Sequence, residues 1–168
     1  MHADEMGCET QDKLLVELDS QEVNMSIKAK LVQIACDVSN QMRDVAEVDV
    51  EDIIAGKAGS CVLIDVRPEA ERRVSVIPGA ITSEAFEENP EAFEGRQLIA
   101  YCTAGYRSGV YAQQMKSQGH EVVNLRGGIL SWCQHEQSLT DNDGNDTHKV
   151  HVYGKMWNLV SAPYEGVW

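Results

Sequence analysis

The sequence has 168 residues, which is enough for one domain with a buried core and some additions. Its formal net charge of -13 argues against nucleic acid and against an anionic membrane surface as partners. Its five cysteines form no CxxC pair, so neither a disulfide framework nor a zinc site is expected, and free thiols fit a reducing cytoplasm. We therefore expect a cytoplasmic protein without a signal peptide, a membrane span, a metal or another cofactor.

Residues 1–46 are predicted to form a helical extension in front of the main domain. A capping box at residues 19–22 opens an amphipathic helix. The apolar stripe of this helix, with spacings of three and four, consists of Ile27, Leu31, Ile34, Val38, Met42 and Val45. We expect the stripe to pack on the surface of the same chain, and the alternative is a homodimer or a partner helix.

Strands and helices alternate through the middle of the sequence. Short apolar runs between turn signals are typical of strands in a parallel sheet that is covered on both faces. Strands are predicted around Val48 and at residues 61–66, 80–81, 98–101 and 121–125. Helices are predicted after Asp49 as N-cap, at 69–73, within 86–93, from 110 to about 118 and around Trp132. This alternation predicts an α/β fold.

Cys102 stands at the end of the apolar strand 98–101, before a short loop that carries Gly105 and leads into a helix. The thiolate is the reactive form of cysteine, and the positive end of a helix stabilises it. The N–H groups of a curled loop would form an anion-binding nest, and Arg107 adds a permanent cation. A lone cysteine at a strand end is usually a packing residue. The small-residue loop, the arginine and the helix start together favour a functional site.

Asp65 closes the strand 61–66, near the place where a parallel sheet has its ligand crevice. We favour a structural role for it over acid–base chemistry, and the cap of a helix or turn is the alternative. Arg67 follows two residues later, and Glu71 is expected to pair with Arg67.

Four segments resemble the motifs of one family in their order and spacing, namely 63–67 with Glu71, 77–80, 102–108 and 123–132. On these motifs the sequence is similar to the rhodanese (sulfurtransferase) family over about residues 48–137. The resemblance implies a rhodanese-like three-layer α/β/α fold with a small central parallel sheet, to which the N-terminal amphipathic helix is an addition.

The resemblance also implies a chemistry in which Cys102 takes up sulfane sulfur as a persulfide and passes it on. Asp65 and Arg67 would support the loop, and its substrate-binding residues would be Thr103, Ala104, Gly105, Tyr106, Arg107 and Ser108. The donor would be thiosulfate, polysulfide or a low-molecular-weight persulfide, and the acceptor would be cyanide, a thiol or a cysteine of another protein. The alternatives are a persulfide carrier without turnover, a partner-binding module and, less favoured because the loop is one residue shorter, a phosphatase or arsenate reductase.

Three regions are expected in the chain: the extension 1–46, the rhodanese-like domain 47–137, and a C-terminal linker with an aromatic tail, 138–168. Residues 138–147 are predicted to be a flexible linker or turn, and residues 148–153 alternate like a strand. The tail is expected to fold back onto the domain, and a pocket rim or a dimer contact is the alternative. Its aromatic residues are Trp157, Tyr164 and Trp168.

Overall fold

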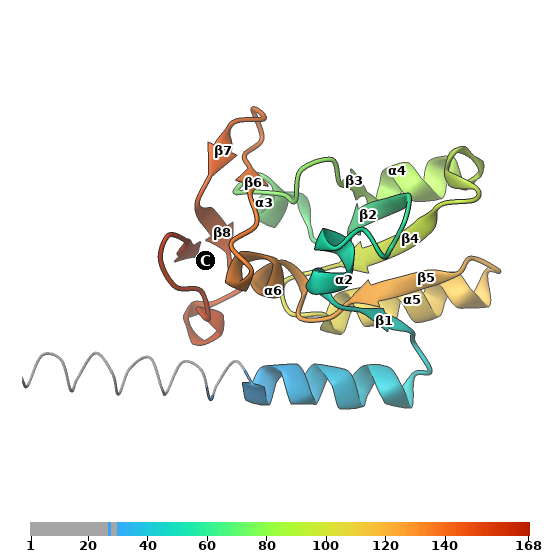
Figure 1. The fold of residues 1–168 in the computed structure, drawn as a ribbon, viewed down its shortest axis with the longest axis horizontal. Coiled ribbons are helices and arrows are strands. Elements are labelled where there is room, and N and C mark those ends of the chain that lie inside the picture. Colours follow the sequence, from blue (N-terminus) through green and yellow to red (C-terminus); the bar gives the residue numbers. More distant parts are fainter. Residues whose placement is uncertain (1–26, 28–29) are drawn as a thin grey trace, which may run out of the picture.

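A parallel sheet of five strands forms the centre of the protein. The computed structural model describes residue 27 and residues 30–168, so the capping box predicted at 19–22 lies outside the described residues. The strand order is β1-β5-β4-β2-β3 (Figure 1). The strands of this sheet are β1 Glu47–Val48, β2 Cys61–Asp65, β3 Ile81–Thr82, β4 Gln97–Tyr101 and β5 Val122–Leu125. The small parallel sheet predicted from the sequence is confirmed.

Helices cover both faces of this sheet. The helices are α2 Val50–Ile54, α3 Glu69–Arg72, α4 Ser83–Glu88, α5 Tyr106–Ser117 and α6 Gly128–Gln134, with a 3-10 turn at Pro90–Phe93. On one face, Phe86 of α4 and Met115 of α5 pack with Ile64 and Ala100 of the sheet. On the other face, α2 and α6 pack against side chains such as Ile99. The three-layer α/β/α fold is therefore confirmed.

The register of the two central strands determines where the loops after them meet. β2 and β4 run parallel with Asp65 paired to Tyr101, so both strands end at the same level. The backbone N–H of Val66 donates to the carbonyl of Tyr101 at 3.1 Å, which extends the pairing one step further. The segment after β2 and the loop after β4, which begins at Cys102, therefore leave the sheet side by side.

The helix formed by residues 30–42 does not bury its apolar stripe, contrary to the sequence-based expectation. The exposed fractions are 52% for Ile27, 61% for Leu31, 57% for Ile34, 52% for Val38 and 84% for Met42. Only Val45, beyond the helix end, is partly buried against the core. The helix instead turns a smaller face toward the domain, where Cys36 and Asn40 are buried.

Asn40 explains this choice of face. Its side-chain N–H donates to Glu47 Oε1 at 2.8 Å and to the carbonyl of Gly105 at 3.3 Å. The amide fits because Gly109 of α5 lacks a side chain, and a Cβ there would lie 1.8 Å from Asn40 Oδ1. Polar pairing to the sheet edge and to the cysteine loop, together with close backbone approach, thus orients this helix.

The C-terminal region adds two small two-stranded sheets. β6 Leu139–Thr140 pairs with β7 Asp146–Thr147 as an antiparallel hairpin, where the sequence predicted a flexible linker or turn. β8 Lys149–His151 then pairs in parallel with β9 Glu165–Val167, and a 3-10 turn, Lys155–Trp157, lies between them. None of the helices in the described part of the chain is both long and apolar enough to cross a membrane.

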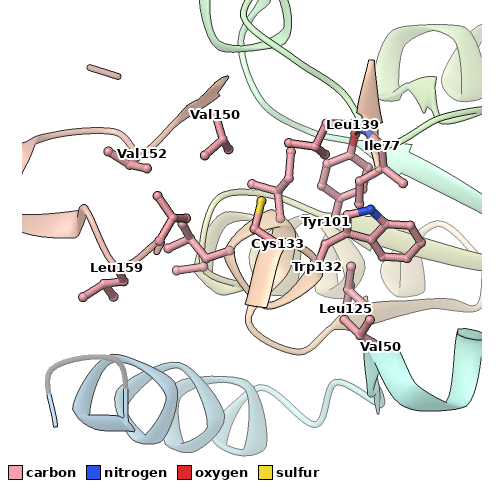
Figure 2. Packing of buried hydrophobic residues seen from close by; sticks show 14 of the residues in the cluster. Val50, Ile77, Tyr101, Leu125, Trp132, Cys133, Leu139, Val150, Val152 and Leu159 are labelled. Carbon is pink, nitrogen blue, oxygen red and sulfur yellow. Dashed lines mark hydrogen bonds between the residues drawn. The ribbon is translucent and has the colours of Figure 1, made fainter. Parts of the chain in front are cut away.

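Side chains from this region enter the core. Val150, Val152 and Leu159 belong to the same buried cluster as Tyr101 and Cys133 (Figure 2). Val150 and Val152 are fully buried. The tail therefore contributes to the hydrophobic core beside α6, and its position relative to the cysteine loop is fixed by packing.

Candidate active site at Cys102

Cys102 lies at the carboxyl end of β4, where the chain turns into α5. The side chain is 2% exposed. Gly105 allows the turn, because its φ of +97° lies in the left-handed region that side chains disfavour. The loop 102–105 therefore curls back over the sulfur before the first turn of α5 begins at Tyr106.

Two donors point at the sulfur. The backbone N–H of Gly105 donates to Cys102 Sγ at 3.2 Å. The hydroxyl of Ser108, in the first turn of α5, lies 3.4 Å from the same atom and is buried. These donors and the positive end of a 12-residue helix are placed to hydrogen-bond an anion bound at this point of the loop.

The start of α6 holds the other side of the loop. The N–H groups of Ile129 and Leu130 donate to the carbonyls of Cys102 and Thr103 at 2.9 and 3.1 Å. Gly128 permits this contact, because a Cβ there would lie 2.3 Å from the carbonyl oxygen of Cys102. The carbonyls of the loop are thus bonded to α6, while one of its N–H groups faces the sulfur.

Arg107 is paired with Glu71, which corrects the expected Glu71–Arg67 pair. Arg107 donates from Nη1 and Nη2 to the two carboxylate oxygens of Glu71 at 2.7 and 2.8 Å. Thr103 joins them, since its hydroxyl lies 3.1 Å from Glu71 Oε2 and 2.9 Å from Arg107 Nη2. Burial opposes the charge on Glu71, but these hydrogen bonds and the charge of Arg107 outweigh it and keep the pKa of Glu71 below its usual value.

Arg67 instead forms a buried ion pair with Asp65. Its Nε lies 2.9 Å from Asp65 Oδ1, and its Nη2 lies 2.6 Å from Oδ2 and 2.7 Å from the carbonyl of Ser75. The hydroxyl of Tyr101 donates to Asp65 Oδ2 at 2.6 Å. Burial disfavours the charge on Arg67, but Asp65 overcomes this and raises the Arg67 pKa. Asp65 and Arg67 thus contact the residue before Cys102 and not the sulfur.

A cavity of about 370 Å³ opens at the cysteine loop. Its lining consists of Cys102, Thr103, Ala104, Tyr106, Arg107, Tyr153 and Trp157. The structure therefore brings five of the predicted site residues to the cavity with Cys102 among them, while Gly105 and Ser108 contact the sulfur from the side. Sequence reasoning missed Glu71 as the partner of Arg107, Asn40 as a contact of the loop, and Tyr153.

Within residue 27 and residues 30–168, no three His, Cys, Asp or Glu side chains gather so that they could hold a metal ion. Cys36, Cys61, Cys102 and Cys133 are all free thiols. Burial raises the pKa of Cys133 to about 12 and that of Cys36 to about 11, so both are poor nucleophiles.

The rhodanese-like domain family matches residues 49–135, more than half of the chain. The chain belongs to this family. A sulfurtransferase of Allochromatium vinosum is 30% identical over 106 residues, which cover 60% of this chain and 99% of the relative. A tRNA uridine(34) hydroxylase of Rickettsia bellii is 33% identical over 87 residues, which cover 46% of this chain and 35% of the relative. The chain thus matches about a third of the length of that hydroxylase.

Solved structures share the fold. The thiosulfate sulfurtransferase of Pseudomonas aeruginosa superposes with a TM-score of 0.52 at 21% identity, over 68% of this chain and 23% of that chain. A protein from Rhodopseudomonas palustris, described as a possible tyrosine phosphatase, gives a TM-score of 0.50 at 23% identity, over 63% of this chain and 91% of that chain. At such identities the likeness concerns the fold alone.

Proposed function

We propose that this protein is a sulfurtransferase that carries sulfane sulfur on Cys102. The observation that carries the proposal is the pair of donors, the Gly105 N–H and the Ser108 hydroxyl, that point at a sulfur lining a cavity. A persulfide anion formed there would extend into the cavity while the loop N–H groups and the helix start stabilise its charge. Membership in the rhodanese-like family and the Allochromatium vinosum relative support the same chemistry.

The proposed reaction has two steps. The Cys102 thiolate attacks the sulfane sulfur of the donor, the donor's bond to that sulfur breaks, and the leaving group departs with the bonding electrons. A thiolate or cyanide then attacks the outer sulfur of the Cys102 persulfide, and the Cys102 thiolate is released. A sulfur atom is transferred in each step, so no external oxidant or reductant is needed.

We propose a small sulfur donor and a thiol, cyanide or protein cysteine as acceptor, in a reducing compartment such as the cytoplasm. Cys102 must stay reduced for this chemistry, which fits such a compartment. We do not extend the tRNA uridine hydroxylase activity to this chain, because a net charge of -13 repels the phosphates of RNA.

Mass spectrometry tests the first step. The protein is incubated with thiosulfate and separately with polysulfide, and its intact mass and modified peptides are determined. We expect one added sulfur on the Cys102 peptide, which cyanide removes. Cys102→Ser should abolish this addition, whereas Cys61→Ser, which removes a partly exposed thiol at the opposite end of the sheet, should retain it. Loading in Cys102→Ser, or none in the wild type with either donor, would refute the assignment.

A further inference from the structure

Two aromatic side chains in the wall of the Cys102 cavity come from outside the family region. The family match ends at residue 135, whereas Tyr153 and Trp157 belong to the C-terminal tail. Their rings meet edge to face, with centroids 6.5 Å apart. The tail thus adds an aromatic wall, defined as Tyr153 and Trp157, to a cavity whose remaining lining comes from the loop and the start of α5.

The core fixes this wall in place. Val150 and Val152 lie just before Tyr153 and are fully buried, and Leu159 lies just after Trp157 and is 6% exposed. Figure 2 shows all three at the cluster around Cys133. The pairing of β8 with β9 also holds the residues just before Tyr153. The two rings therefore stand between anchored points of the backbone.

Tyr153 has a backbone conformation that tyrosine rarely adopts. Its φ is +69°, in the left-handed region, where bulky residues are uncommon and mark functional sites when the surroundings impose them. Its N–H donates to His151 Nδ1 at 3.1 Å. Tyr153 is 63% exposed, so core packing does not explain the conformation. This conformation places the ring centroid of Tyr153 5.4 Å from the Arg107 guanidinium.

The charge of the cavity does not suit a doubly charged donor. Among the described residues that line it, Arg107 is the one basic side chain, and its Nη1 and Nη2 both donate to the buried carboxylate of Glu71. The ring of Tyr153 covers part of the same guanidinium. A dianion such as thiosulfate would thus meet a cation whose charge Glu71 already balances, whereas an apolar group would contact Ala104 and the aromatic wall.

We propose that the aromatic wall selects the donor, and that this donor is an organic persulfide with an apolar or aromatic group next to its sulfur. The inference rests on the proposed sulfurtransferase function and specifies its substrate class. The volume of about 370 Å³ suits a small organic molecule. Tyr153 and Trp157 bind the organic group and determine specificity, while Cys102 carries the chemistry.

The transfer balances with this donor. The Cys102 thiolate attacks the terminal sulfur of R–S–SH, and the donor's S–S bond breaks. The thiolate R–S⁻ leaves with the bonding electrons, and Cys102 retains the terminal sulfur as Cys–S–SH, which loses its proton beside the loop N–H groups. The sulfane sulfur moves from the donor to Cys102, and no other reactant takes part.

Steady-state kinetics of the full chain with two donors test this. The rate of thiocyanate formation from cyanide is measured with benzyl persulfide, generated in situ, and with thiosulfate, and the rate of Cys102→Ser is subtracted as background. We expect the wild type to show the higher kcat/KM with benzyl persulfide. Tyr153→Asn, which suits a left-handed backbone, and Trp157→Ala should each lower the ratio of the two kcat/KM values by about fivefold, chiefly through KM for benzyl persulfide.

Trp168→Ala is the matched control, because Trp168 is an exposed aromatic residue of the same tail that does not line the cavity, and its ratio should equal that of the wild type. A higher kcat/KM for thiosulfate in the wild type, or an unchanged ratio in both wall variants, would overturn the inference. Failure of the proposed function would look different, because then no donor would load sulfur on Cys102 at all.

Discussion

Glu71 shows how a single residue adjusts the charge of the candidate site. It is buried, and it accepts two hydrogen bonds from Arg107 and one from the hydroxyl of Thr103. A buried carboxylate is stable only when such partners compensate for lost hydration. Glu71 therefore links α3 to the cysteine loop through charge, and this link depends on its ionisation.

The pH dependence of stability tests this link with Glu71→Gln. The pKa of Glu71 in the folded protein is held below the ordinary value of 4.5. As the pH falls below 4.5, the Glu71 carboxylate is protonated first in the unfolded chain and only at lower pH in the folded protein. The contribution of Glu71 to the free energy of unfolding is therefore present at neutral pH and is lost as the pH falls through the folded-state pKa. Glu71→Gln has no carboxylate at this position, so its stability does not depend on this protonation.

We therefore expect urea denaturation to show that the wild type is more stable than Glu71→Gln at pH 7, and that this difference shrinks steadily toward pH 3. Glu69→Gln serves as the control, because Glu69 is an exposed partner of Arg73 on the same short helix, and its difference from the wild type should vary little with pH. A difference for Glu71→Gln that is constant or grows in acid would contradict the assignment.

At the scale of elements, the contact between the helix 30–42 and α5 reaches the active-site loop. Asn40 donates to the carbonyl of Gly105, the residue whose N–H faces Cys102 Sγ. The contact depends on the missing side chain at Gly109. The N-terminal helix is thus joined to the loop through its polar face, while its apolar stripe stays exposed.

A double-mutant cycle measures this contact. Alanine has a higher helix propensity than glycine by about 1 kcal/mol, yet Gly109→Ala should lower the free energy of unfolding by about 2 kcal/mol, because its Cβ overlaps with Asn40. In an Asn40→Ala background the overlap is removed, and Gly109→Ala should be neutral or stabilising. Additive effects of the two changes in urea denaturation would show that the helix does not pack in this way.

At the scale of the whole molecule, the chain carries a net charge of -13, although the proposed function requires Cys102 to hold a persulfide anion. The described cavity has one basic side chain, and that side chain is paired. Long-range attraction of an anionic donor is therefore not expected, and the global field opposes its approach.

Salt should accordingly accelerate the reaction with thiosulfate. Raising the ionic strength from about 10 mM to about 150 mM shortens the screening length from about 30 Å to about 8 Å. We expect kcat/KM for thiosulfate to rise by about twofold or more, and that of a singly charged donor to rise less. A fall with added salt would mean that local attraction by Arg107 dominates the encounter.

Much of the architecture could be predicted from the sequence, because it depends on local patterns. The apolar runs of β2, β4 and β5 and the glycines before α5 and α6 determine strands and turns, and Cys102 stands between two of these signals. The pairings that cross the fold could not be predicted in this way. Glu71 is close in sequence to Arg67 but bonds to Arg107, because α3 turns it toward the loop after β4.

The orientation of the N-terminal helix was wrong in the prediction for a similar reason. Hydrophobic spacing identifies an apolar stripe but does not reveal that the buried amide of Asn40 donates to Glu47 at the sheet edge and to the carbonyl of Gly105 in the cysteine loop. The position of Tyr153 over Arg107 was equally hidden, because it depends on a left-handed residue and on the packing of β8. These are contacts between distant segments, and periodicity carries no information about them.

The fit of Gly128 against the cysteine loop has a further consequence for the energy of the reaction. With its carbonyls bonded to the N–H groups of Ile129 and Leu130, the loop loses its conformational freedom when the protein folds and not when a donor arrives. Under the proposed function, the loop that would hold the extra sulfur is formed before the sulfur arrives, so loading and unloading of Cys102 would require little reorganisation of the backbone. The thiol form and the persulfide form that we propose for Cys102 would therefore share one conformation of this loop.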